Sequence, residues 1–322
     1  MQALCELFGK SKQAYYKYDE QRVLMKSAAR AFAIEYAESI RQHDPGMGIT
    51  KIWEMYRREF RFEEEILGRD VFADLLVESG MKVRLKVRKP RTTDSTHGLP
   101  TFPNIVKDFI PTASNQLWVS DITYITIWLP NGEYYFCYLS LILDAYSKEI
   151  VGYCVGDSLK TECPLEALRM ALKRLYGSKE HNLIHHSDRG TQYASSDYIK
   201  LLRENNIRIS MTETGDPKDN AQAERINNTM KNELLKDKVF RSIEEVISAV
   251  AKAIDFYNNR RPHMSINNMT PAQAVGCVGE ITKKWHSYRE DVIKAKLDIP
   301  EISLSLQCCQ GSPSGLRPLV NP

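Results

Sequence analysis

Residues 117–128 read LWVSDITYITIW, an apolar and β-branched stretch that predicts a strand and contains one acidic residue, Asp121. The segment LPNGEY follows and predicts a hairpin turn at Asn131-Gly132. Two further strand-like stretches, YYFCYLSLILDAY and KEIVGYCVGD, come directly afterwards. Three strands in succession predict an antiparallel meander.

Beyond the meander, helical and strand patterns alternate. PLEALRMALKRLYG is an amphipathic helix, NLIHHSD a short strand, SSDYIKLLRENN a helix capped by Ser195 or Ser196, and IRISMTE another strand. DNAQAERINNTMKNELLKD and SIEEVISAVAKAIDFYNNRR are expected as long helices. This order predicts an α/β fold with a mixed five-stranded sheet covered by helices.

The first 80 residues have helical periodicity throughout. Helical patterns cover residues 23–41, stop at HDPGMG, and return in ITKIWEMYRREF and RDVFADLLVESG, where Gly80 is expected to close the last turn. The opening LCELFGKSKQAYYKY fits a helix-turn-helix and a surface helical hairpin equally well. The expected regions are a helical part (1–80), a basic arm with a Pro-rich linker (81–116), a core (117–275) and a tail (276–322).

Charge is distributed unevenly along the chain. A net charge of +3 does not by itself indicate a polyanionic partner, but MKVRLKVRKPR gathers basic residues without an acidic one. This arm is either a solvated linker or, as we favour, an extended segment that lays its charge along a phosphate backbone. Its predicted DNA contacts are Lys82, Arg84, Lys86 and Arg88.

Cysteine usage and hydropathy indicate the cellular compartment. Seven cysteines without a CxxC pair indicate a reducing cytoplasm and argue against a structural zinc site. The amino end has no apolar stretch of signal-peptide length, and the longest apolar run, residues 134–143, is about half of a membrane span. We therefore expect a cytoplasmic protein without a membrane partner.

Three carboxylates stand where burial is unfavourable for a charge. Asp121 interrupts the first strand, Asp188 ends the fourth, and Glu224 lies on the following helix. Taken singly, each is more often a structural residue. If the first strand lies beside the fourth, however, Asp121 and Asp188 are neighbours, and a helix packed across that edge brings Glu224 to both.

Three converging carboxylates raise one another's pKa, and a divalent cation removes that repulsion. Ligands that are all oxygen favour Mg²⁺ or Mn²⁺. Two such ions would support in-line phosphoryl transfer. The polar cluster HHSDRG after the fourth strand would then form the mouth of a metal site.

The motifs around these acids resemble a known family. WVSDITYI, HSDRGTQY and DNAQAE, with 35 residues between Asp188 and Glu224, resemble the DD(35)E signature of retroviral-integrase-like transposases. In detail, the chain is similar to the OrfB product of the IS-three family of insertion sequences. The resemblance extends over about residues 91 to 275 and includes the segments TTDSTHGLP, IVGY and YNNRRPHMSINNMTPAQA.

The resemblance implies an RNase H-like core in which Asp121, Asp188 and Glu224 are the catalytic, metal-binding triad. It also implies a transposase that binds the double-stranded ends of a mobile element in the bacterial cytoplasm, at the nucleoid. Such an enzyme cuts one strand with metal-activated water and joins the freed 3′ hydroxyl to DNA. Two alternatives stay open, namely an RNase H-like nuclease without strand transfer and an inactive DNA-binding regulator.

The resemblance also implies partners. Two DNA ends require at least a dimer, so a homo-oligomer on DNA is expected. Members of the family are often made by fusion with an upstream OrfA product that carries a helix-turn-helix and a leucine zipper. Because the chain begins directly at the second reading frame, we expect that module as a fusion or a separate partner.

Further candidates surround the acids. Lys231 follows Glu224 by seven residues and would point the same way on a helix, whereas Glu233 would point away. Asp144 is expected to fix a turn. Where the family often shows an arginine-rich tract, PGMGITKIW contains only one basic residue, Lys51, so DNA contact there is not expected. The predicted DNA contacts near the acids are His186, Arg189, Asn228, Lys231, Arg260 and Arg261, for the last two of which packing is an equal alternative.

Overall fold

The computed structural model describes residues 20–62, 66–83, 98–175, 182–213 and 220–297, together with residues 5, 7–9, 11 and 13. The chain divides into two compact units, residues 1–286 and residues 287–322. Most of the expected opening helical pair lies outside the described residues, as do Arg84, Lys86 and Arg88 of the basic arm. Among the helices in the described ranges, none has both the length and the apolar character needed to cross a bilayer.

A five-stranded sheet with the order β3-β2-β1-β4-β5 forms the centre of the larger unit. β1 (Leu117–Trp128), β2 (Tyr134–Asp144) and β3 (Ile150–Gly156) form the antiparallel meander. β4 (Ile184–Ser187) pairs in parallel with β1, and β5 (Arg208–Met211) pairs in parallel with β4. The mixed five-stranded sheet predicted from the sequence is therefore confirmed.

The turn between β1 and β2 is the predicted one. The N–H of Gly132 donates a hydrogen bond to the carbonyl of Leu129 at 3.0 Å, and the φ of Gly132 is 86°. A positive φ of this size is one that glycine adopts without a steric penalty. The Asn131-Gly132 pair thus sets the register that β1 and β2 keep over their full length.

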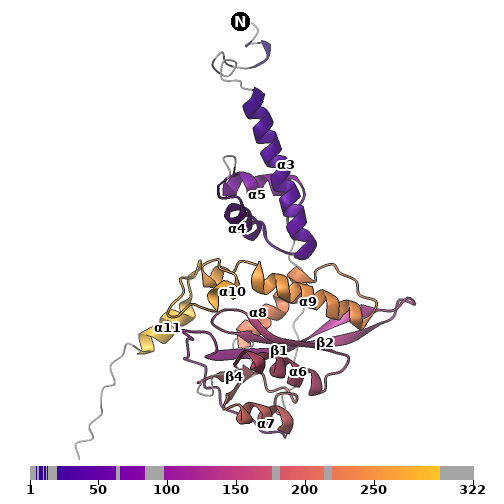
Figure 1. The fold of residues 1–322 in the computed structure, drawn as a ribbon, viewed down its shortest axis with the longest axis vertical. Coiled ribbons are helices and arrows are strands. Elements are labelled where there is room, and N and C mark those ends of the chain that lie inside the picture. Colours follow the sequence, from indigo (N-terminus) through magenta and orange to yellow (C-terminus); the bar gives the residue numbers. More distant parts are fainter. Residues whose placement is uncertain are drawn as a thin grey trace, which may run out of the picture. The chain divides into compact units, whose positions relative to one another are not determined.

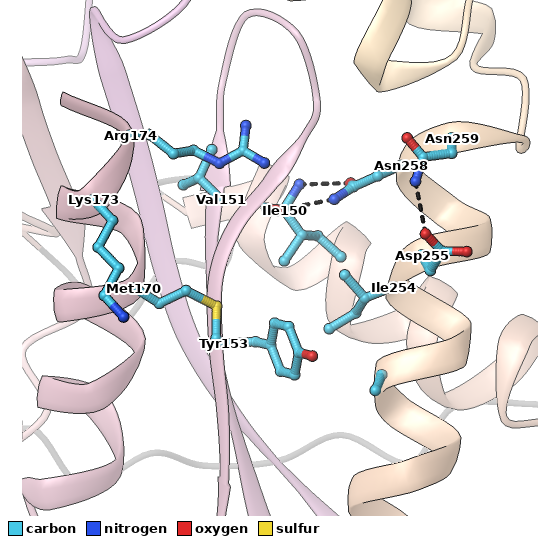
Figure 2. Close-up of a pocket in the computed structure, with 11 residues that line it drawn as sticks. Ile150, Val151, Tyr153, Met170, Lys173, Arg174, Ile254, Asp255, Asn258 and Asn259 are labelled. Atoms are coloured by element: carbon cyan, nitrogen blue, oxygen red, sulfur yellow. Dashed lines mark hydrogen bonds between the residues drawn. The ribbon is translucent and has the colours of Figure 1, made fainter. Parts of the chain in front are cut away.

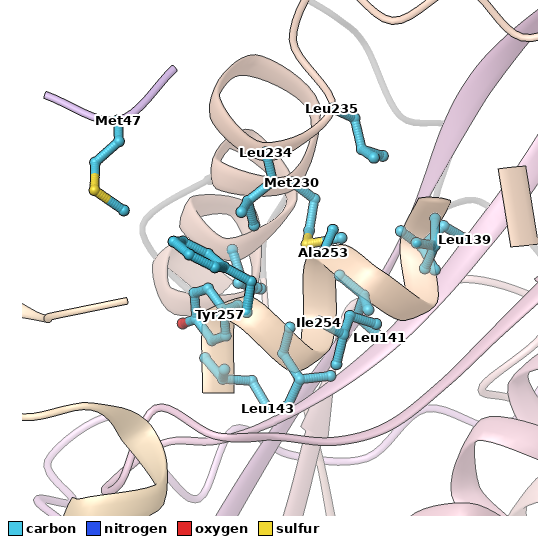
Figure 3. Packing of buried hydrophobic residues seen from close by; sticks show 14 of the residues in the cluster. Met47, Leu139, Leu141, Leu143, Met230, Leu234, Leu235, Ala253, Ile254 and Tyr257 are labelled. Carbon is cyan, nitrogen blue, oxygen red and sulfur yellow. The ribbon is translucent and has the colours of Figure 1, made fainter. Parts of the chain in front are cut away.

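Helices cover both faces of the sheet (Figure 1). α8 (Ala221–Thr229) and α9 (Ile243–Asn259) pack on one face, and α6 (Glu162–Leu172) and α7 (Ser196–Glu204) pack on the other. Odd-numbered residues of β1 join the first cluster and Trp118 joins the second, as strand alternation requires. Figure 3 shows side chains of β2 packing against those of α9 in the first cluster.

The amino-terminal region contains three described helices, α3 (Glu20–His43), α4 (Ile49–Glu59) and α5 (Arg69–Glu78), which confirms the predicted all-helical region. Gly80 has a φ of 73° and ends α5 as expected. Rings of α3, α4 and α5 pack together, and their apolar side chains belong to the same cluster as those of α9. The core is therefore continuous between the amino-terminal helices and one face of the sheet.

Two elements differ from the prediction. The helix that begins with α8 does not continue as one regular α-helix, because a π-helical turn, η3 (Met230–Leu234), replaces its second half. In this turn the carbonyl of Glu233 accepts a hydrogen bond from the distant N–H of Gly46 at 2.9 Å. The second difference is α11 (Tyr288–Leu297), a helix in the smaller unit that the sequence pattern did not predict.

Candidate active site

Asp121 lies in β1, and Asp188 directly follows β4, the strand beside β1. β1 and β4 run parallel, with Leu117 opposite Ile184 and Val119 opposite His186. If this register continues by one pleat beyond the end of β4, Asp188 lies opposite Asp121. The predicted adjacency of the first and fourth strands is confirmed.

α8 brings Glu224 to this edge because two asparagines fix the helix to β1. The side-chain amide of Asn220 donates to the carbonyl of Ser120 at 3.0 Å. The side-chain amide of Asn227 donates to Asp121 Oδ2 at 2.8 Å. Glu224 precedes Asn227 by three residues and therefore shares its face of the helix, which is turned toward Asp121.

The acids act on one another electrostatically. The pKa of Asp121 is raised to about 7, first by burial and then by the negative charge of Asp188, with a smaller contribution from Glu224. Hydrogen bonds donated by the Ile122 N–H and by Asn227 oppose this rise. The charges of Asp188 and Glu224 thus both act on the carboxylate of Asp121 and raise its pKa.

Backbone donors hold two of the acids in fixed orientations. Asp121 Oδ1 accepts from the Ile122 N–H at 2.9 Å, and Asp188 Oδ1 accepts from the Gly190 N–H at 2.9 Å. A Cβ on Gly190 would lie 2.9 Å from that Asp188 oxygen, so a larger residue would disturb it. The loop after β4 is therefore shaped around the carboxylate of Asp188.

In the part of the chain that the structure describes, no three His, Cys, Asp or Glu side chains are arranged so that they could hold a metal ion as they stand. The chemistry of the three acids nevertheless fits a hard divalent cation. All their donor atoms are oxygens, and a bound cation would offset both the burial of the Asp121 charge and its repulsion by Asp188 and Glu224, which together raise the pKa of Asp121.

The predicted DNA contacts nearest to the acids lie in different environments. His186 is 1% exposed, and its Nδ1 lies 2.9 Å from Ser210 Oγ inside the sheet. Arg189 is partly exposed, and its Nε donates to the carbonyl of Thr212 at 2.6 Å. Lys231 Nζ lies 3.7 Å from the centre of the Tyr124 ring, over the strand that carries Asp121.

The remaining predicted contacts divide into exposed and buried residues. Lys82 and Arg260 are exposed, and Asn228 is partly exposed. Arg261 is 4% exposed, and its guanidinium forms two hydrogen bonds with Glu233. Its side chain is therefore engaged within the protein, in agreement with the packing alternative.

Asp144 forms a turn, as expected. Its Oδ1 accepts from the N–H groups of Tyr146 and Ser147 at 3.0 and 2.8 Å, and its Oδ2 accepts from the Asn115 N–H at 2.7 Å. These contacts fill the oxygens of this buried carboxylate. Asp144 therefore has a structural role between β2 and β3.

The sequence analysis missed several residues beside the acids. Asn220 and the pairing of Asn227 with Asp121 were not predicted, although the spacing of three residues from Glu224 was a usable signal. Lys148 was also missed, and its Nζ donates to Gln222 Oε1 at 2.8 Å, two residues before Glu224. Burial and then the charge of Lys283 lower the pKa of Lys148 to about 7.

A cavity of about 410 Å³ lies elsewhere, between β3, the end of α6 and α9 (Figure 2). Asn258 of α9 lines it and binds both backbone groups of Ile150, accepting from the N–H at 2.9 Å and donating to the carbonyl at 3.0 Å. Asp121, Asp188 and Glu224 are not among its lining residues. The cavity is therefore separate from the candidate active site.

Comparisons with known proteins identify relatives of this chain. Two integrase core domain models match residues 111–217 and 205–271. The chain is 34% identical over 275 residues to the 31 kDa protein of insertion element IS600 from Shigella sonnei, covering 84% of this chain and 96% of that protein. It is 32% identical over 277 residues to the transposase of insertion sequence IS629 from Shigella sonnei, covering 84% and 90%.

Two further similarities are more distant. Transposase InsF of insertion sequence IS3A from Escherichia coli K12 is 26% identical over 286 residues, covering 85% of this chain and 93% of that protein. The HTLV-2 integrase catalytic core domain, solved in complex with magnesium, aligns with a TM-score of 0.38 and 17% identity, covering 51% of this chain and 97% of that chain.

Asp121→Asn should stabilise the metal-free protein at alkaline pH, because a neutral amide removes the cost of burying a charge and then the repulsion from Asp188 and Glu224. The pKa of Asp121 in the folded protein is raised from its ordinary value of 3.8 to about 7. The wild type should therefore lose stability as the pH rises between these two values. The loss is on the order of 2 kcal/mol. Thermal unfolding in EDTA at pH 5 and pH 8 measures it.

The matched control for this comparison is Asp157→Asn, which changes an exposed carboxylate. It should follow the wild type at both pH values. An equal loss of stability in wild type and Asp121→Asn would show that the carboxylates do not repel one another.

Proposed function

The chain belongs to the insertion-sequence transposases with an integrase core domain, and we propose that it cuts and joins DNA at one carboxylate site formed by Asp121, Asp188 and Glu224. The reaction class is polynucleotidyl transfer. The observation that carries the proposal is the electrostatic coupling of Asp121 to Asp188 and Glu224 where β1, the end of β4 and α8 meet.

The proposed cofactor is Mg²⁺ or Mn²⁺, as two ions held by the carboxylates of Asp121, Asp188 and Glu224. When bound, such ions supply activation of the attacking hydroxyl and stabilisation of the leaving oxygen. The chain's own residues set the orientation of the ligands. Asn227 fixes Asp121, and the Gly190 N–H fixes Asp188.

Both chemical steps can use this one site, because cleavage by water and joining by a 3′ hydroxyl are in-line displacements at phosphorus with the same geometry. The rigid sheet holds two of the acids, and α8 holds the third. The enzyme's main contribution is therefore to position the reacting groups. No covalent intermediate with the protein is needed.

We propose that double-stranded DNA lies across the edge that carries the acids. Arg189 and Lys231 stand beside Asp188 and over β1, and Asn228 follows Asn227 on α8. The exposed Arg225 adds positive charge on α8. The other proposed contacts are Arg260 and the basic arm with Lys82, Arg84, Lys86 and Arg88, whereas the burial of His186 argues against its predicted DNA contact.

The proposed assembly is a homo-oligomer on DNA, since two element ends must be held together for joining. We propose an upstream OrfA product as its fusion or partner, and the bacterial cytoplasm, at the nucleoid, as its location. The relatives named above with a function are transposases or an integrase, which supports strand transfer. They give no support to a nuclease without strand transfer or to an inactive regulator.

Asp188→Asn should abolish strand transfer. Loss of a metal-binding carboxylate removes several kcal/mol of transition-state stabilisation, which corresponds to about a hundredfold or greater loss of rate. The assay joins the element's own ends to target DNA with Mg²⁺, and Asp157→Asn is the control with normal activity. Wild-type levels of product from Asp188→Asn would contradict the assigned role.

Mg²⁺ should also raise the melting temperature of the wild-type protein without DNA, because a ligand that binds only the folded state stabilises it. The rise should be larger at pH 8 than at pH 6, since Asp121 has to be ionised to bind. Asp188→Asn should show a much smaller rise in a thermal shift titration. An identical rise in both proteins would place the cation elsewhere.

A further inference from the structure

A second group of charges lies away from the acids, where the amino-terminal helices meet the turn that follows α8. It consists of Asp44 after α3, Lys51 in α4, Glu233 in η3 and Arg261 after α9, and we call it the buried charge cluster. Asp44 is 0% exposed. The members come from four separate segments, so the cluster joins parts that are distant in the sequence.

Glu233 is the centre of this cluster. Arg261 Nε and Nη2 donate to its two carboxylate oxygens at 2.8 and 2.9 Å, a bidentate pair. Lys51 Nζ donates to Glu233 Oε1 at 3.0 Å. Burial opposes ionisation of Glu233, yet the charges of Arg261 and Lys51 lower its pKa to about 2. Glu233 is therefore a firmly ionised carboxylate that binds both α4 and the segment after α9.

Asp44 completes the cluster as a fully buried acid. Among the described residues, no group donates a hydrogen bond to either of its carboxylate oxygens, and Arg261 Nε lies 3.7 Å from its Oδ2. Burial and then the charge of Glu233 raise the pKa of Asp44 to about 8, against the opposing charges of Arg261 and Lys51. The raised pKa favours the protonated form of Asp44 beside the ionised carboxylate of Glu233.

The backbone fits equally closely at this point. The N–H of Gly46 donates to the carbonyl of Glu233 at 2.9 Å, and a Cβ on Gly46 would lie 2.3 Å from Glu233 Cα. The next residue, Met47, is fully buried in the apolar cluster that contains Met230 and Tyr257 (Figure 3). Residues 45–47, which we call the docking loop, thus lie directly on η3.

η3 continues the helix that carries Glu224. The amino-terminal end of α8 is fixed to β1 through Asn220, and its middle is fixed through Asn227. The turn after it is fixed through Glu233 to the docking loop and the buried charge cluster. The helix is therefore held at one end by the sheet and at the other by the amino-terminal helices.

We propose that the docking loop and the buried charge cluster position Glu224, so that docking of the amino-terminal helices controls the candidate active site. This inference rests on the proposed function of Glu224. The proposed positioning residues act on Glu224 through η3 and α8; they are Asp44, Gly46, Lys51, Glu233 and Arg261. A conformation of the amino-terminal helices that releases η3 would leave Glu224 free to move away from Asp121.

Gly46→Ala tests the proposal, because its Cβ would collide with the backbone of Glu233. Gly48→Ala is the matched control, since nothing lies within 4 Å of a Cβ there and the φ of Gly48 is −71°. Hydrogen exchange should become faster over residues 221–234 in Gly46→Ala and stay unchanged in Gly48→Ala. This readout needs neither DNA nor activity, so it separates failure of this inference from failure of the proposed function.

The enzymatic part of the same test measures strand transfer against Mg²⁺ concentration. Gly46→Ala should need about tenfold more Mg²⁺ for half-maximal rate, because Glu224 has to be drawn into place by the cation. Gly48→Ala should match the wild type. Unchanged exchange and an unchanged Mg²⁺ dependence in Gly46→Ala would overturn the proposal, and a general fall in melting temperature with no selective change at 221–234 would also overturn it.

Asp44 provides a conservative rescue. Asp44→Asn should keep the wild-type exchange and Mg²⁺ dependence, since the amide can donate to Glu233, whereas Asp44→Ala should resemble Gly46→Ala. Because the folded pKa of Asp44 is raised from its ordinary value of 3.8 to about 8, wild-type docking should weaken as the pH rises between these two values; the cationic groups that face Asp44 are Lys51, Arg261 and Arg41. Asp44→Asn should lack this pH-dependent loss. Equal damage from Asn and Ala at position 44 would contradict a role for the protonated form of Asp44.

Discussion

The parallel pairing of β1 with β4 is the constraint on which the candidate site depends. It brings β1, which contains Asp121, beside the end of β4, which Asp188 directly follows, and a slip of one residue would turn Asp121 to the opposite face of the sheet. The antiparallel pairing with β2 prevents that slip along the whole of β1. Apolar side chains on both faces hold β1 in this register, so packing brings the acids together despite their repulsion.

At the candidate site, the charges of the acids therefore oppose a fold that the rest of the sequence favours. The alternation of β1 and the turn at Gly132 favour the same structure, whereas the burial and repulsion that raise the pKa of Asp121 work against it. Such conflicts concentrate at functional sites, because a folded protein tolerates them only where the surrounding structure is strong enough. Here the amide of Asn227 and the N–H of Ile122 reduce the conflict without removing it.

The sheet and most helices could be predicted because residues 117–211 carry clear periods of two and 3.6 residues. The spacing of Asp121 and Asp188 could be predicted from strand ends for the same reason. The partners of individual polar side chains could not. Lys51 meets Glu233 across 182 residues of sequence, and no local pattern encodes that contact. α11 was missed because its apolar residues form no stripe along one face.

The π-helical turn at Met230–Leu234 has a consequence for how this segment tolerates change in length. A π-turn accommodates one residue more than an α-turn, so deleting a single residue here would leave a regular helix. Because the wide turn absorbs the extra residue, side chains after it would keep their positions, and the deletion would act on the residues inside the turn, which include Glu233. A shortened turn that moved Glu233 would leave the buried guanidinium of Arg261 with Asp44, whose Oδ2 lies 3.7 Å from Arg261 Nε, so the deletion would weaken the buried charge cluster without removing it.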